Sequence, residues 1–374
     1  MVKLKIARDV KRYMNRLLMK LEKIGRDPKI TAKSVGLRYV ADSSPGYIRK
    51  KAGDGWNFYD ADGHLVKDEG LLTRFNKLVI PPAYTNVWIS PYENGHLQFT
   101  GTDAAGRKQY RYHAGWNKIR NQSKYHRMQT FASYLPVIRR QVDKDLARPN
   151  LDHDKVVALV VRLMELTSIR VGNESYKKLY GSFGLTTLQD RHVQISGTSL
   201  KFEFKGKKGV FHKISLQSKK LARLVKQCRD IPGKDLFQYY NADGEHCAIG
   251  SGDVNHYLHQ ITGEDFTAKD FRTWSGSVSA LYAFKDAGEF TTVTECKKKI
   301  VSVLDEVALN LGNTRTVCKK YYVHPTVIKS YEEGTIFHYI KQLDDDKDVK
   351  TAELNKAEKA LLEILEHEKL AEAS

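Results

Sequence analysis

The chain has 374 residues, enough for two domains that each bury a core, and its 41% hydrophobic content excludes the intrinsically disordered class. No apolar run approaches the roughly 20 residues needed to span a bilayer, and the N-terminus lacks the apolar core of a signal peptide, so a cytoplasmic protein is expected. The net charge of +18 is concentrated in residues 1–150, which sum to about +16, and this excess favours binding to a polyanion over a membrane surface.

The first third of the chain is predicted to be a short helix followed by a small antiparallel sheet. Residues 7–24 place apolar side chains at helical spacing among many basic ones, which predicts an amphipathic helix. From about residue 35 to 113, turn clusters such as AGDG, DADGH and YENG separate β-rich runs: GLRYV, GYIRKK, WNFYD, NVWIS, HLQFT and KQYRYH. DADGH at 60–64 is similar to the start of a calcium loop but lacks the later ligands, so a hairpin turn is predicted there.

The rest of the chain is predicted to be mostly helical. Periodic patterns predict helices at 115–145, 154–168, 216–229, 251–261, 267–287, 291–310 and 352–370. A small β element interrupts them at about 190–214, and DDDKD at 344–348 is predicted to be a solvated linker. The sequence therefore predicts an α+β protein with a small β-rich N-terminal domain (1–120), a larger, mostly α-helical domain (121–345) and a C-terminal linker and helix (346–374).

The sequence lacks the motifs that several kinds of chemistry require. There is no GxxxxGK[ST] loop to cradle a nucleotide phosphate, and no HExxH motif or clustered metal-type histidines. The four cysteines lack CxxC spacing, which indicates neither a zinc site nor a disulfide framework. We therefore expect no nucleotide cofactor, no other cofactor and no metal, which weakens the interpretation as a nuclease or ligase.

A set of cations followed by tyrosines remains as the candidate for chemistry. Arg170 follows an apolar helix, Lys207 lies in a lysine-rich turn, Arg272 lies in FTAKDFRTWSGS, and LGNTRTVCKKYYVHP holds Tyr321 and Tyr322. Phosphoryl transfer needs donors for the non-bridging oxygens, an acid for the leaving oxygen and a nucleophile, tasks that suit arginine, lysine and tyrosine. Each residue taken singly also fits a structural role, such as a helix end, a solvated hairpin or aromatic packing. The joint pattern favours catalysis.

The four segments that contain these residues resemble, in order, the catalytic motifs of the poxvirus-like and bacterial type IB DNA topoisomerases. They are SIRVGNESY, FKGKKG, FTAKDFRTWSGS and LGNTRTVCKKYYVHP. GRKQYRYH at 106–113 resembles a DNA-contacting motif of that family's N-terminal domain. The resemblance covers roughly residues 30–335 and implies a catalytic domain of the topoisomerase IB/tyrosine recombinase type. It implies an isomerase that relaxes supercoiled duplex DNA by transient cleavage of one strand, swivelling and religation, without ATP or a required metal. It also implies a monomer clamping DNA, at the nucleoid of a bacterium or in the factory or virion of a large virus.

The resemblance also assigns roles to individual residues. Tyr322 would be the nucleophile and would form a 3′-phosphotyrosyl link. Arg170 and Arg272 would bind the non-bridging oxygens, and Lys207 would protonate the departing 5′ oxygen. Lys269, three residues before Arg272 and so on the same helical side, would assist that acid or contact the phosphate.

Asn313 is the main departure from the viral pattern. It stands nine residues before Tyr322, where the poxvirus branch has histidine, and so favours the bacterial-type branch. An amide can donate a hydrogen bond to phosphate but cannot carry charge or exchange a proton. The same spacing selects Tyr322 over Tyr321, since adjacent helical residues point about 100° apart and only one can face the phosphate. We expect Tyr321 to be packed and His324 to be structural or a neighbour of the phosphate.

Four further residues match DNA-facing positions of the family. Gln109, Tyr110 and Tyr112 match residues that touch the major groove, and Tyr176 matches another DNA-facing position. On a strand, residues 110 and 112 share one face while 109 lies on the other. The alternative is a half-buried sheet with ordinary aromatic packing.

Two other functions fit part of the pattern. A tyrosine recombinase shares the fold and the tyrosyl chemistry, but it usually has histidine three residues before the second arginine and histidine or tryptophan ahead of the tyrosine. Lys269 and Asn313 occupy those places here, and the β-rich N-terminal part replaces the helical arm-binding domain of recombinases. A non-enzymatic basic DNA-binding protein would explain the charge but not the ordered arginine, lysine, arginine and tyrosine.

Overall fold

The computed structural model describes residues 27–104, 106, 108–341, 343 and 352–373, apart from the side chains of 121–126 and 368–373. The helix predicted at 7–24 and the linker predicted at 344–348 lie outside the described residues. The chain divides into two compact units, Met1–His126 and Arg127–Ser374, and the domain boundaries proposed from the sequence at 120 and 345 stay a prediction. Within the described ranges, no helix is both long and apolar enough to cross a membrane.

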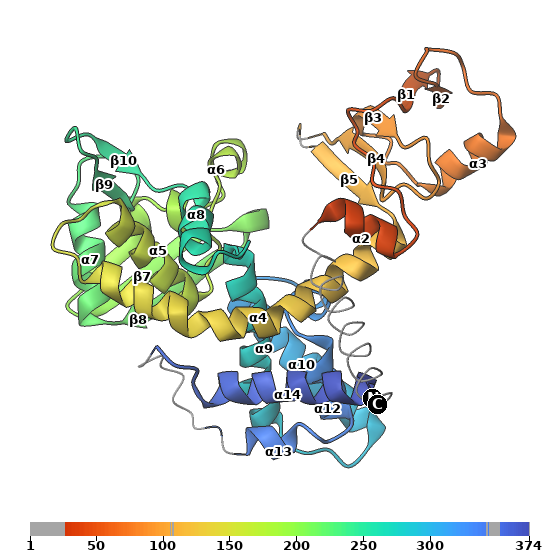
Figure 1. Cartoon of the computed structure of the whole chain (residues 1–374). Helices are drawn as coiled ribbons and strands as arrows, with labels where there is room; N and C mark the ends of the chain where they lie inside the picture. The colour runs from red at the N-terminus through yellow and green to blue at the C-terminus, as the bar shows by residue number, and fades with distance from the viewer. Residues whose placement is uncertain (1–26, 105, 107, 342, 344–351, 374) are drawn as a thin grey trace, which may run out of the picture. The chain divides into compact units, whose positions relative to one another are not determined.

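The first unit contains a five-stranded antiparallel sheet (Figure 1). The strands are β1 (Tyr47–Ala52), β2 (Gly55–Tyr59), β3 (Thr85–Ile89), β4 (Leu97–Thr102) and β5 (Lys108–Tyr112), in the order β2-β1-β3-β4-β5. Two short helices, α2 (Pro28–Ser34) and α3 (Glu69–Lys77), were not predicted. Strands and α3 share a core of Phe58, Phe75, Val87, Ile89 and Phe99.

Five of the six β-rich runs form strands, and GLRYV at 36–40 does not. Arg38 makes only an isolated bridge to Gly95. Leu37 and Val40 are buried in two small apolar clusters instead of pairing along an edge. The apolar content of this run therefore serves side-chain burial, a role that the pattern of a short run cannot distinguish from strand pairing.

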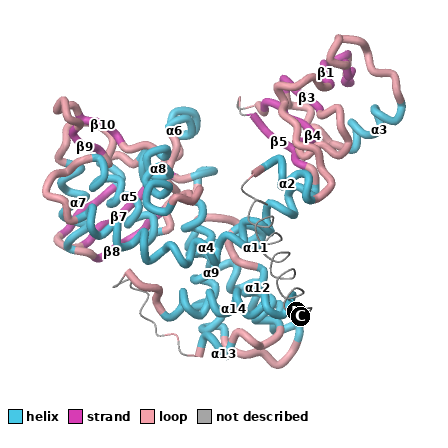
Figure 2. Tube along the Cα trace, viewed as in Figure 1, coloured by secondary structure: helices cyan, strands magenta, loops and turns pink. Residues whose placement is uncertain are grey.

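The second unit is mostly helical, with a three-stranded sheet and a two-stranded hairpin (Figure 2). Its helices are α4 (Ala114–Leu146, which begins in the first unit), α5 (His153–Thr167), α6 (Glu174–Tyr180), α7 (Lys219–Arg229), α8 (Ser251–Thr262), α9 (Ala268–Ala287), α10 (Val293–Leu311), α11 (Arg315–Tyr321), α12 (Pro325–Glu332), α13 (Phe337–Ile340) and α14 (Lys356–Ala373). The sheet holds β6 (Val193–Ser196), β7 (Ser199–Lys205) and β8 (Phe211–Gln217), and the hairpin holds β9 (Gln238–Tyr240) and β10 (His246–Ala248). All seven predicted long helices are present, which confirms the α+β class with a larger helical part.

Helix α5 is the central element of the second unit. Every residue from 155 to 164 is buried, because the helix packs against α7, α8 and α9. Asp152 begins the helix by accepting a hydrogen bond from the backbone N–H of Lys155. Ser168 ends it in the left-handed conformation, with φ of 54°, and so turns the chain toward Arg170.

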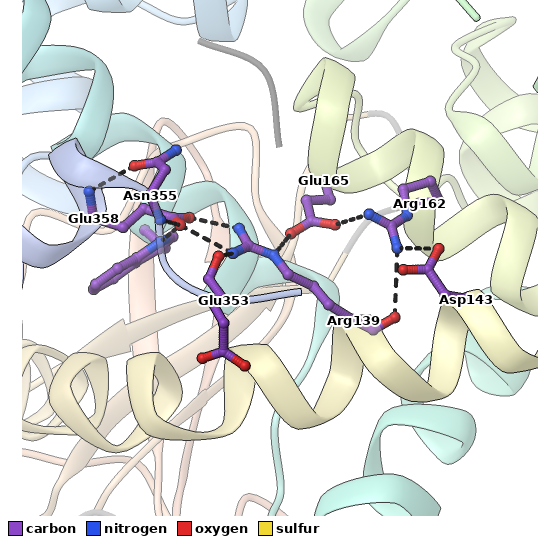
Figure 3. A network of polar contacts seen from close by, with 8 residues as sticks. Arg139, Asp143, Arg162, Glu165, Glu353, Asn355 and Glu358 are labelled. Carbon is purple, nitrogen blue, oxygen red and sulfur yellow. Dashed lines mark hydrogen bonds and ion pairs between the residues drawn. The ribbon is translucent and has the colours of Figure 1, made fainter. Parts of the chain in front are cut away.

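A buried network of charges joins α4, α5, α9 and the C-terminal segment (Figure 3). The guanidinium of Arg139 is almost fully buried and donates to Glu165 at 2.7 Å and to both oxygens of Glu358 at 2.6 and 3.0 Å. Glu358 also accepts from the indole N–H of Trp274 at 3.1 Å. These four residues line part of a cavity of about 280 Å³. The network fixes α14 to α9, the helix that also carries Arg272.

Replacing Glu358 with alanine is expected to lower the free energy of unfolding by about 3–5 kcal/mol, because it leaves Arg139 buried with one carboxylate fewer. Glu353→Ala is the matched control. The carboxylate of Glu353 pairs with Arg140, and the two side chains are 68% and 56% exposed, so its loss should cost less than about 1 kcal/mol. Urea denaturation of the full chain measures both variants. Equal losses would show that the Glu358 network does not hold α14 in place.

Candidate active site

The backbone around Arg170 is held by hydrogen bonds from the segment at residues 184–186. The N–H of Leu185 donates to the Arg170 carbonyl at 2.8 Å, and the N–H of Thr186 donates to the Val171 carbonyl at 2.7 Å. A Cβ at Gly184 would lie 2.5 Å from the Arg170 carbonyl oxygen, so only glycine lets the two segments approach this closely. The half-buried side chain of Arg170 therefore projects from a rigid loop.

Arg272 lies near the start of α9 and is 4% exposed. One terminal nitrogen donates to the Leu311 carbonyl at 2.8 Å, and the other donates to the Ser168 carbonyl. Its Nε is buried and has no hydrogen-bond partner among the described residues. Since a guanidinium carries five N–H groups, Arg272 keeps donors for a ligand while it ties the end of α5 to the end of α10.

Residues 311–313, here called the 311–313 turn, hold both arginines. Arg170 donates to the side-chain oxygen of Asn313 at 2.5 Å and to the Gly312 carbonyl at 3.3 Å. The amide nitrogen of Asn313 donates to the Leu311 carbonyl, which also accepts from Arg272. The turn therefore sets the separation of the two guanidiniums, and the oxygen of Asn313 is committed to Arg170.

Tyr322 follows α11 directly and lies beside Arg272. The centroid of its ring is 5.1 Å from the guanidinium carbon of Arg272. Its carbonyl accepts from the Ser277 hydroxyl at 3.2 Å, and a Cβ at Gly276 would lie 2.8 Å from the same oxygen. Close contact with the glycine face of α9 therefore places the Tyr322 ring against Arg272.

Tyr321 and His324 have other surroundings. The ring of Tyr321 lies 5.3 Å from the ammonium of Lys320. His324 caps α12, because its Nδ1 accepts from the N–H of Thr326 at 3.1 Å. The structure therefore gives His324 a structural role and brings Tyr322 to Arg272.

The electrostatics of Arg170 reflect two cations held in one place. The pKa of Arg170 is lowered to about 10, chiefly by burial and then by the charge of Arg272, while interaction with Tyr322 opposes the change. Arg170 is still protonated at neutral pH. An anion that lies between the two guanidiniums would relieve their repulsion and would accept charge-assisted hydrogen bonds.

Lys207 lies in the turn between β7 and β8, and its ammonium is 5.8 Å from the centroid of the Tyr176 ring. Desolvation is the main cause that lowers the pKa of Lys207, although much of the side chain is exposed. The charge of Arg170 lowers it next, and the exposed Lys269 on α9 adds a smaller contribution of the same sign. Lys207 therefore shares the surroundings of Arg170 and releases a proton more readily than an isolated lysine.

The three candidate DNA-binding residues of the first unit lie on β5. Tyr110 and Tyr112 share a face, with ring centroids 6.1 Å apart and planes 6° apart. Tyr110 is 50% exposed, whereas Tyr112 is half-buried and packs near Trp116. Gln109 donates its amide N–H to Asp103 at 2.8 Å. Tyr110 thus presents an exposed aromatic surface, while the amide of Gln109 already has an internal partner.

Asp60, Asp62 and His64 form the one group among the described residues whose side chains could together approach a metal ion. One oxygen of Asp60 accepts from the backbone N–H groups of Asp62 and His64 at 3.0 and 2.8 Å. These bonds close the turn predicted for DADGH. Asp62 and His64 are exposed, and all three residues lie in the first unit, whereas the arginines lie in the second.

Three residues of the site were not singled out in the sequence. Gly276 and Ser277 lie inside the motif that carries Arg272, where their spacing from it is visible but their contact with Tyr322 is not. His212 lies on β8, five residues after Lys207, and packs against the 311–313 turn. No sequence signal indicates that packing.

Comparisons with known proteins agree with the motifs. Residues 113–356 match the family described as eukaryotic DNA topoisomerase I, catalytic core, and residues 55–103 match the bacterial DNA topoisomerase IB N-terminal domain. The chain is 30% identical over 308 residues to DNA topoisomerase 1B of Acanthamoeba polyphaga mimivirus, covering 80% of this chain and 91% of that protein. It is 23% identical over 256 residues to DNA topoisomerase I of monkeypox virus, covering 67% and 77% of the two chains. It is 25% identical over 268 residues to DNA topoisomerase 1 of rabbit fibroma virus, covering 67% and 78%. The chain therefore belongs to the type IB DNA topoisomerases, a family of isomerases that bind duplex DNA.

Proposed function

We propose that this protein relaxes supercoiled duplex DNA by cutting one strand through Tyr322, letting the duplex swivel and resealing the strand. The observation that carries the proposal is the position of the Tyr322 ring beside Arg272, in the same unit as Arg170 and Lys207. A tyrosyl phosphodiester keeps the energy of the broken bond, so resealing needs no ATP.

Each step of the proposed cleavage reaction can be assigned to a side chain with suitable chemistry. The phenol of Tyr322 loses its proton to water as its oxygen attacks the phosphorus, and the bond from phosphorus to the 5′ oxygen breaks, which leaves a 3′-phosphotyrosyl link. Arg170 and Arg272 donate to the non-bridging oxygens, where negative charge is concentrated in the transition state. Lys207 gives a proton to the departing 5′ oxygen, a role that its lowered pKa favours. Lys269, exposed one turn before Arg272, assists this acid or contacts the phosphate.

Asn313 acts mainly through Arg170 in this proposal. Its side-chain oxygen accepts from Arg170 at 2.5 Å, which orients the guanidinium. One amide hydrogen is engaged with the Leu311 carbonyl and the amide also bonds to Cys318, so a hydrogen bond to a phosphate oxygen would replace the one to Cys318. The amide therefore supplies orientation and one hydrogen bond, without the charge that a histidine could carry.

Contacts outside the chemical site would hold the duplex. We assign the exposed ring of Tyr110, with Tyr112 and Gln109, and the 43%-exposed ring of Tyr176 to DNA. The positive charge of the chain would bind mostly phosphates, which position the duplex without reading its sequence. A cytoplasmic monomer that clamps DNA without a nucleotide cofactor is the form we propose.

The proposal is tested with supercoiled plasmid and with a nicked duplex that traps the covalent intermediate. We expect relaxation in EDTA without ATP, and after proteolysis a DNA 3′ phosphate attached to the peptide that contains Tyr322. An adduct on Tyr321 would contradict the choice of nucleophile. Strand exchange between two target sites would indicate a recombinase, and binding with neither reaction would indicate a non-enzymatic DNA-binding protein.

A further inference from the structure

His212 lies inside the candidate active site, and the proposed reaction gives it no task. It lies on β8 opposite Phe204 of β7, in the hairpin whose turn carries Lys207. Its ring stacks on Phe204 with centroids 5.0 Å apart and planes 15° apart. The hairpin therefore holds the imidazole in a defined orientation.

The imidazole of His212 lies between two glycines from different parts of the site. A Cβ at Gly206 would lie 2.6 Å from the ring, and a Cβ at Gly312 would overlap the ring. Neither position has room for a side chain, so the ring contacts the backbone on both sides. Gly206 begins the turn that carries Lys207, and Gly312 is the centre of the 311–313 turn that holds both arginines. His212 is thus a packing link between the lysine and the arginines.

The charges around the ring favour its neutral form. Burial lowers the pKa of His212, and the charges of Arg170 and Arg272, which face it from the loop after α5 and from α9, lower it further. The residues that contact the ring itself, Phe204, Gly206 and Gly312, carry no titratable side chain. A neutral ring fills this space without adding a third positive charge.

We propose that His212 is a positioning residue: its imidazole fixes the β7–β8 hairpin against the 311–313 turn and so holds the Lys207 ammonium at the scissile phosphate. The proposal rests on the role of Lys207 as general acid proposed above. Lys207 lies in an exposed turn, so this packing would determine how far it stands from the arginines. Small displacements of a catalytic group can cost about 100-fold in rate.

The test measures single-turnover cleavage of two DNA duplexes that differ in one atom. At the cleaved bond, the 5′ bridging atom is oxygen in one duplex and sulfur in the other. A thiol has a pKa near 8.5, far below that of an alcohol, so the sulfur leaves without a proton. Sulfur should therefore restore any variant that has lost only proton donation. We expect His212→Ala to cleave the oxygen substrate about 10- to 100-fold more slowly than the wild type and the sulfur substrate at nearly the wild-type rate.

Further variants make the result decisive. His212→Phe keeps a ring between the glycines and should recover most of the rate lost in His212→Ala. His212→Gln lacks the ring and should behave like His212→Ala. It serves as a second disrupting variant if the alanine protein does not fold. Lys207→Ala is the reference for a variant that has lost the proton donor itself. If sulfur fails to restore Lys207→Ala, the proposed general acid is wrong. If sulfur restores Lys207→Ala but not His212→Ala, or if both disrupting variants cleave the oxygen substrate normally, the positioning proposal is wrong.

Discussion

Replacing Tyr322 with phenylalanine is expected to abolish plasmid relaxation and covalent adduct formation, with a loss of more than about 10⁴-fold in cleavage rate. The change removes only the phenolic oxygen, which is the atom that attacks phosphorus in the proposed reaction. The ring remains beside Arg272, where it packs 5.1 Å from the guanidinium carbon. DNA binding should therefore stay close to that of the wild type.

Tyr321→Phe is the matched control for this experiment. Tyr321 is adjacent in sequence but lies near Lys320, so its hydroxyl should not contribute to cleavage. Relaxation of supercoiled plasmid and binding to a labelled duplex are measured for both variants. Relaxation by Tyr322→Phe at the wild-type rate, or a loss that follows Tyr321 instead, would overturn the assignment of the nucleophile.

The second large effect is expected at Arg272. Arg272→Ala should slow cleavage by at least about 10²- to 10³-fold at saturating DNA, the cost typical of removing one donor to a developing oxyanion. Arg272→Lys should recover little of this loss. An ammonium cannot reproduce the planar fork that reaches the Ser168 and Leu311 carbonyls and still points donors at a phosphate.

Controls separate transition-state stabilisation from damage to the fold or to DNA binding. Arg223→Ala removes an exposed arginine on α7 and should leave the cleavage rate nearly unchanged. Urea denaturation shows whether Arg272→Ala is folded under assay conditions, since its buried guanidinium also ties α5 to α10. A variant that is folded and cleaves normally once saturated with DNA would show that Arg272 only binds.

The presence of the seven long helices of the second unit, and the order of the residues assigned to chemistry, were determined by the sequence alone. Helical periodicity and capping residues act over one or two turns, so the pattern of a segment predicts its conformation without knowledge of its neighbours. Helix α9, predicted at 267–287, forms Ala268–Ala287 with Thr267 as its cap. The roles of Arg170, Lys207, Arg272 and Tyr322 came instead from the resemblance of four ordered motifs to those of the type IB topoisomerases.

Only the tertiary structure decided what these residues touch. Arg170 and Asn313 are 143 residues apart, and Arg139 and Glu358 are 219 apart, so no local spacing encodes either contact. The contact of His212 with Gly312 joins two segments that are likewise remote in sequence, and it exists because Gly312 has no side chain in the space that the His212 ring fills. Periodicity constrains dihedral angles along the chain, whereas the partners of a side chain depend on how distant elements pack around it.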